Sequence, residues 1–80
     1  DPKFTKEDVL AYIEQKYGGD YWLYDCFLQL YNERNEENGK VWRLRWNVAF
    51  GSPDFSGYEL WIDADTGEIL HFFDEESVNY

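Results

Sequence analysis

Cys26 and His71, the single thiol and the single imidazole of the sequence, are the first candidates for catalysis. A nucleophilic Cys–His pair needs both side chains on one face, within hydrogen-bond distance. The strand patterns described below put Cys26 among apolar core positions and His71 on the opposite face. We therefore expect a buried structural thiol, a surface histidine partly shielded by aromatic rings, and no catalytic residues.

Two aspartates in the segment D-A-D-T-G, Asp63 and Asp65, resemble the start of a calcium loop. Such a loop needs oxygen ligands at alternate positions and a closing glutamate. Gly67 stands at the third position, and no glutamate follows at the required distance. Nor does the sequence contain a serine triad or a phosphate-binding glycine loop. We expect no metal, no cofactor and no enzymatic activity.

Residues 58–73 are expected to form the hairpin around which the chain is organised. Apolar and polar residues alternate on both sides of a segment that suits a type I turn closed by a left-handed glycine. In the register of this three-residue loop, Ile62 faces Leu70 on an apolar face, and Trp61 faces His71 on an outer face. The residues assigned to the turn are Asp63, Asp65, Thr66 and Gly67.

The rest of the chain supplies a helix and two more strands. A helix is predicted over 4–17, with Thr5 as N-cap and a Gly-Gly stop at 18–19. Strands are predicted over 21–31 and 41–50, and the polar loop 32–40 joins them. Their predicted core positions are Trp22, Tyr24, Cys26, Leu28 and Leu30 in the first strand, and Trp42, Leu44, Trp46, Val48 and Phe50 in the second. Residues 1–80 thus form one α+β domain, with an N-terminal helix packed on a four-stranded antiparallel sheet.

The sheet face turned away from the helix is the candidate partner-binding face. Its mixture of aromatic rings and arginine is typical of binding hot spots. The same mixture also stabilises a sheet that has no partner, through cross-strand pairs and arginine stacked on rings. The candidate residues are Phe27, Tyr31, Arg43, Arg45, Trp61, Ile69, His71 and Phe73, and the alternation adds Tyr21 and Leu23 to the same face.

Composition excludes several classes of partner. The net charge of -10 repels phosphate backbones and anionic lipid surfaces, so nucleic acid is not expected. No apolar run approaches the roughly 20 residues that span a bilayer, so we expect no membrane insertion by this segment. One cysteine permits neither an internal disulfide nor a cysteine-based zinc site. The aromatic content of 21% lets so short a chain form a core.

The segment D-A-D-T-G-E-I-L, from Asp63 to Leu70, resembles the C-terminal signature of PepSY domains, and the order of one helix and then strands fits over nearly all of the chain. The resemblance implies a cystatin-like two-layer fold and an extracytoplasmic setting, in a secreted, cell-surface or membrane-anchored parent protein. It implies a chaperone-like or inhibitory role towards a peptidase, or regulation of cell-surface proteolysis. Because the family motif is structural, no inhibitory residue is carried over. Tyr12 and Tyr17 depart from the smaller residues expected in the helix.

Three functions follow as hypotheses. The first is a non-catalytic interaction module whose outer face, or a strand edge, meets a protein partner. The second is a small-molecule pocket between helix and sheet, although Trp42, Trp46, Tyr24 and Phe72 are expected to point inward and fill that space. The third is that the aromatic face meets its own copy in a homodimer or lies under another domain of the parent chain.

Overall fold

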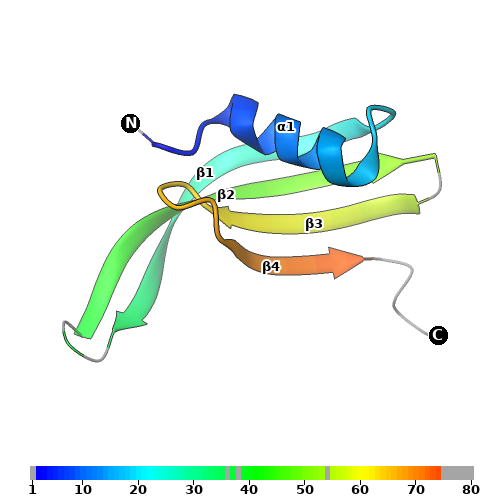
Figure 1. Ribbon diagram of the computed structural model, residues 1–80. Coiled ribbons are helices and arrows are strands. Elements are labelled where there is room, and N and C mark those ends of the chain that lie inside the picture. The colour runs from blue at the N-terminus through cyan, green and yellow to red at the C-terminus, as the bar shows by residue number, and fades with distance from the viewer. Residues whose placement is uncertain (1, 36, 38, 54, 75–80) are drawn as a thin grey trace, which may run out of the picture.

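One helix lies across one face of a four-stranded antiparallel sheet (Figure 1). The computed structural model describes residues 2–35, 37, 39–53 and 55–74. The strands follow their chain order across the sheet, β1-β2-β3-β4. The elements are α1 (Lys6–Tyr17), β1 (Trp22–Asn35), β2 (Gly39–Ser52), β3 (Phe55–Asp63) and β4 (Ile69–Asp74). The architecture confirms the predicted α+β fold with one helix and four antiparallel strands.

The helix begins and ends at the predicted signals. Thr5 has an extended backbone (φ -88°, ψ 172°), and its hydroxyl accepts a hydrogen bond from the Asp8 amide, while the Asp8 carboxylate accepts one from the Thr5 amide. This capping box satisfies two amides that the first turn leaves unpaired. Gly18, with φ 92°, closes the helix and donates to the Glu14 carbonyl. No helix in the described part of the chain is long and apolar enough to cross a membrane.

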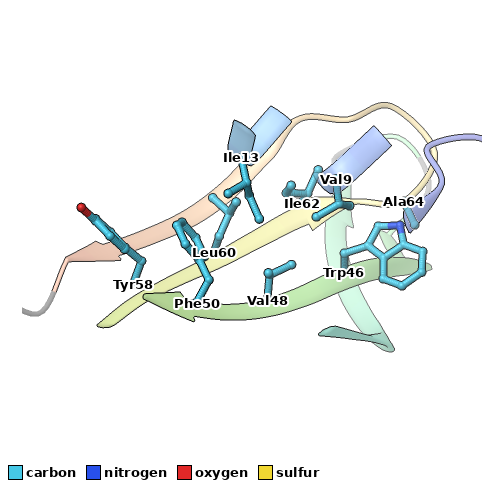
Figure 2. Close-up of a cluster of buried hydrophobic side chains, with 9 residues drawn as sticks. All are labelled: Val9, Ile13, Trp46, Val48, Phe50, Tyr58, Leu60, Ile62 and Ala64. Carbon is cyan, nitrogen blue, oxygen red and sulfur yellow. The ribbon is translucent and has the colours of Figure 1, made fainter. Parts of the chain in front are cut away.

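The core lies between α1 and the two central strands, β2 and β3 (Figure 2). Tyr17, at the end of the helix, packs its ring within 5.3 Å of the Phe50 ring centroid and 5.1 Å of that of Tyr58. At this end of the core the contact between helix and sheet is therefore made by aromatic rings. The buried cluster is Val9, Ile13, Trp46, Val48, Phe50, Tyr58, Leu60, Ile62 and Ala64.

The start of β1 differs from the prediction. The register opposite β2 shifts between Leu23 and Asp25, so Tyr24 is an extra, bulged residue. Leu23 pairs with Phe50 and, with Tyr21, packs against the core. The prediction that Trp22 and Tyr24 belong to the core and Tyr21 and Leu23 to the outer face was therefore wrong, because one extra residue exchanges the two faces. Trp22 and Tyr24 are 44% and 60% exposed.

The β1–β2 hairpin reaches well past the helix (Figure 1). Its strands have 14 residues each, about 46 Å at 3.3 Å per residue, whereas the 12-residue helix is about 18 Å long. The helix therefore covers only part of the hairpin's apolar face. The predicted core positions that stay exposed in the far part are Leu28, Leu30, Trp42 and Leu44.

The β3–β4 connection has one residue more than predicted. The Asp63 amide donates to the Glu68 carbonyl and the Gly67 amide to the Asp63 carbonyl, both at 2.9 Å, so the loop spans residues 64–67. A register shift after the confirmed pair of Trp61 and His71 then places Ile69, and not the predicted Leu70, opposite Ile62. Gly67 has φ 78°, which confirms the predicted left-handed conformation.

Candidate functional site

The outer face, meaning the sheet face opposite α1, brings together most of the predicted binding residues. Ile69 does not belong to it, because its partner Ile62 is buried beneath the helix. Ile69 had been assigned to the outer face from strict alternation, which the register shift in β4 breaks. The predicted residues that do share the outer face are Phe27, Tyr31, Arg43, Arg45, Trp61, His71 and Phe73.

Asp63, the last residue of β3, accepts most of the hydrogen bonds at the loop end of the outer face. It is 2% exposed, and its Oδ2 accepts hydrogen bonds from the Tyr31 hydroxyl at 2.7 Å and Arg43 Nε at 2.8 Å. Its Oδ1 accepts from Arg43 Nη2 at 3.0 Å and from the Asp65 and Thr66 amides at 2.9 Å each. These bonds hold the pKa of Asp63 well below its usual range, chiefly through Arg43. Asp63 thus fixes the loop to β1 and β2.

The two partners of Asp63 have shifted pKa values of their own. Burial and then the hydrogen bond to Asp63 raise the pKa of Tyr31 to about 12. The hydrogen bond to Asp63 raises the pKa of Arg43, which also lies 3.3 Å from a Glu33 oxygen and 3.7 Å from an Asp65 oxygen. Because its donors already have acceptors inside the domain, Arg43 is poorly suited to capture a partner's carboxylate.

Arg45 is held in a second polar network. Its guanidinium carbon lies 3.7 Å from the centre of the Trp61 ring and 5.7 Å from that of Tyr31. Its Nε donates to Asn47 Oδ1 at 2.7 Å and its Nη2 to Gln29 Oε1 at 3.2 Å. The middle of the outer face therefore contains the stacked arginine that was considered as an alternative to partner binding.

His71 and Cys26 lie on opposite faces of the sheet. The His71 ring is 4.4 Å from that of Trp61, and its buried Nε2 lies 3.2 Å from a Glu59 oxygen without satisfying hydrogen-bond geometry to any described atom. Cys26 pairs with Val48 on the helix side, where burial raises the pKa of its thiol. The two side chains are not brought together. Among the described residues no group of His, Cys, Asp and Glu could hold a metal ion.

Two exposed phenyl rings belong to the outer face, on which the exposed Trp22 also lies. Phe27 and Phe73 are 43% and 42% exposed. Beside Phe27 a shallow groove of about 140 Å³ lies over the small side chain of Ala49, and Asp25 and Glu59 contribute to its lining. The groove therefore offers aromatic contact with acidic groups beside it.

Sequence reasoning missed a second surface, on the helix side of the protruding hairpin. We call Leu28, Leu30, Trp42 and Leu44 the uncovered row, and they are 38%, 61%, 66% and 39% exposed. Alternation shows which face a side chain is on but not how far the covering helix extends. The difference in length between the apolar strand pattern and the 12-residue helix is the signal that was available.

A groove runs along the uncovered row. It has a volume of about 300 Å³, is open, and is lined by Leu30, Trp42 and Leu44 from the hairpin and by Pro2 and Ala64 from the chain before α1 and after β3. It is therefore not the pocket between helix and sheet considered from the sequence. Of the four rings expected to fill the space there, Trp46 is 8% exposed, whereas Trp42, Tyr24 and Phe72 are 66%, 60% and 42% exposed.

Comparison of the chain with protein-family models, with curated proteins and with solved structures finds no match.

Proposed function

We propose that this domain is a non-catalytic protein-interaction module that contacts its partner through the outer face. The observation that carries the proposal is the exposure of Phe27 and Phe73 on a face whose arginines, Arg43 and Arg45, are hydrogen-bonded within the domain. Exposed rings on a rigid support lose little conformational entropy on binding, which favours their use as anchors. In this proposal Arg43, Arg45, Trp61 and Tyr31 keep the surface in shape, and the two phenyl rings make the contact.

The charge of the surroundings favours a basic or neutral partner. The groove beside Phe27 is lined by Asp25 and Glu59, and the whole chain carries a net charge of -10. An acidic partner would be repelled during approach.

The proposal extends to the PepSY resemblance. It is supported by the order of one helix and four antiparallel strands and by the left-handed Gly67 in the D-A-D-T-G-E-I-L segment. On this basis the fold is cystatin-like, the setting is extracytoplasmic, and the partner is a peptidase that the domain restrains or another domain of the parent chain that it assists. A homodimer through the same two rings is the alternative.

Site-specific photo-crosslinking in the organism that makes the protein tests the proposal. A benzoylphenylalanine replaces Phe73, and a matched domain carries it at Gln15, which is exposed on the helix. The expected result is a discrete adduct from position 73 that is absent from position 15 and is lost when Phe27→Ser is added. Identical adducts from both positions, or none from position 73, would refute docking through the outer face. An adduct of twice the domain's mass would identify the homodimer.

A further inference from the structure

The helix layer of this domain is incomplete over the protruding hairpin. A sheet with one apolar face is stable when a second layer covers that face, and α1 covers it over β2, β3 and the first part of β1 but not over the protruding part of the hairpin (Figures 1 and 2). From Leu28 to Arg34 the uncovered part of β1 extends over about 20 Å, the length of a helix of roughly 13 residues. With β2 beside it, the uncovered strip is about as wide as one helix.

Two cations lie on this face at the end of the uncovered strip towards the tip of the hairpin. Arg34 and Lys40 are opposite one another in the register, and they follow Leu30 and Leu44 on the same face at the alternating positions of each strand. Neither forms an ion pair with any described side chain. They place two positive charges side by side on this face in a chain of net charge -10. An occupant with carboxylates at this end would complement them.

The other end of the strip, beside Pro2 and Ala64, has no such excess of positive charge. There Lys3 Nζ lies 3.8 Å from an Asp65 oxygen, so the cation and the carboxylate offset each other. Arg43 contributes to the lining of the groove, but its guanidinium is bonded to Asp63 on the other side of the sheet. The strip therefore has an apolar surface made by the uncovered row, the polar Asn32 opposite Trp42, and two cations at one end only.

We propose that the uncovered row is the docking site of an amphipathic helix from a partner protein, with its apolar stripe on Leu30 and Trp42 and its acidic end beside Arg34 and Lys40. The bound helix completes the layer that α1 begins. A second copy of this chain fits less well, because antiparallel stacking of two hairpins would place Arg34 and Lys40 against the neutral Lys3–Asp65 pair. Each copy would also carry the charge of -10 towards the other.

The test uses two labelled 14-residue peptides with the same leucine stripe, one ending in three glutamates and the other in three lysines, titrated with the 80-residue domain. Fluorescence polarisation is expected to show saturable binding of the glutamate peptide with a dissociation constant at least tenfold lower than that of the lysine peptide. The Trp42→Ser domain should bind the glutamate peptide at least tenfold more weakly. Because Trp42 is 66% exposed, this variant should keep the circular dichroism spectrum of the parent.

Two further variants separate this site from the outer face. In the domain with Arg34→Glu and Lys40→Glu the preference between the two peptides should reverse, whereas Phe27→Ser with Phe73→Ser should leave both affinities unchanged. Equal affinities for the two peptides, no saturable binding, or loss of binding in the outer-face variant would overturn the proposal. So would a dimer in sedimentation equilibrium that Trp42→Ser dissociates, because it would assign the strip to a second copy. None of these results bears on crosslinking from Phe73.

Discussion

The ring of Phe4 lies directly on the α-carbon of Gly67, so that a β-carbon at Gly67 would stand 2.8 Å from Phe4 Cδ1. The contact joins the segment before α1 to the β3–β4 loop. Two hydrogen bonds also hold Phe4 in place. Its amide donates to the Ala64 carbonyl at 2.9 Å, and Trp46 Nε1 donates to its carbonyl at 2.8 Å. Gly67 is therefore required both for its backbone angle and for the space above it.

We expect Gly67→Ala to lower the free energy of unfolding by roughly 3 kcal/mol, because a side chain is strained at φ 78° and also collides with the Phe4 ring. The matched control is Gly39→Ala, at φ 72° with open space around the added carbon, which should cost about 1 kcal/mol. Urea unfolding measures both variants. If the two variants lost the same free energy of unfolding, the Phe4 ring would be able to move away from the added carbon without an energetic cost.

Replacing Asp63 by Asn should destabilise the domain at pH 7 by roughly 3 kcal/mol, since Arg43 would lose its buried counter-ion. The folded-state pKa of Asp63 lies below that of the unfolded chain. Its stabilising contribution is therefore present above pH of about 4 and is lost as the pH falls through the folded-state value. The free energy of unfolding of the Asp63→Asn variant should therefore decrease less on acidification than that of the parent domain.

The control for that measurement is Asp65→Asn, whose side chain is 54% exposed. We expect it to change the free energy of unfolding at pH 7 by no more than about 0.5 kcal/mol. If Asp65→Asn were as destabilising as Asp63→Asn, the loop would depend on general charge balance and not on the five bonds to Asp63.

Tyr31→Phe should remove one tyrosine that ionises late. The pKa of Tyr31 is raised to about 12, and burial also raises that of Tyr17 to about 12. The stability that this raised pKa gives is complete below the unfolded-state pKa of about 10 and is lost as the pH rises towards 12. Absorbance at 295 nm should show one late tyrosine fewer in the variant than in the parent domain. Equal numbers of late tyrosines in the two proteins would contradict the assignment.

Much of the fold follows from local signals, although residues 32–35 and 39–40, expected in a polar loop, belong to β1 and β2. Thr5 and Gly18 bound the helix where the capping rules place them, and alternation correctly separates Ile62 from Trp61. What alternation cannot show is where a strand gains an extra residue. The bulge at Tyr24 and the register shift in β4 depend on how neighbouring strands close their ladders, which is information that no single strand contains.

The candidate site could be predicted only in part, because it too depends on contacts between strands. Tyr31, Arg43 and Arg45 are on the predicted face, yet their donors are bonded within the domain, and the pattern of residue types does not reveal this. The aspartate that organises them, Asp63, was assigned only to the turn. Arg43 lies on the neighbouring strand, two residues from the register partner of Asp63, and this proximity becomes visible only once the registers are fixed.

Two tryptophans predicted to point inward provide the last test, because the structure gives them different surroundings. Trp46 is 8% exposed and donates to the Phe4 carbonyl, whereas Trp42 is 66% exposed on the uncovered row. Trp46→Phe should therefore cost roughly 2 kcal/mol, through the lost bond and the lost volume, and Trp42→Phe no more than about 0.5 kcal/mol. Urea unfolding of the two variants compares them directly. Similar losses from both would mean that a helix layer covers Trp42 in solution, and would contradict an open strip on the hairpin.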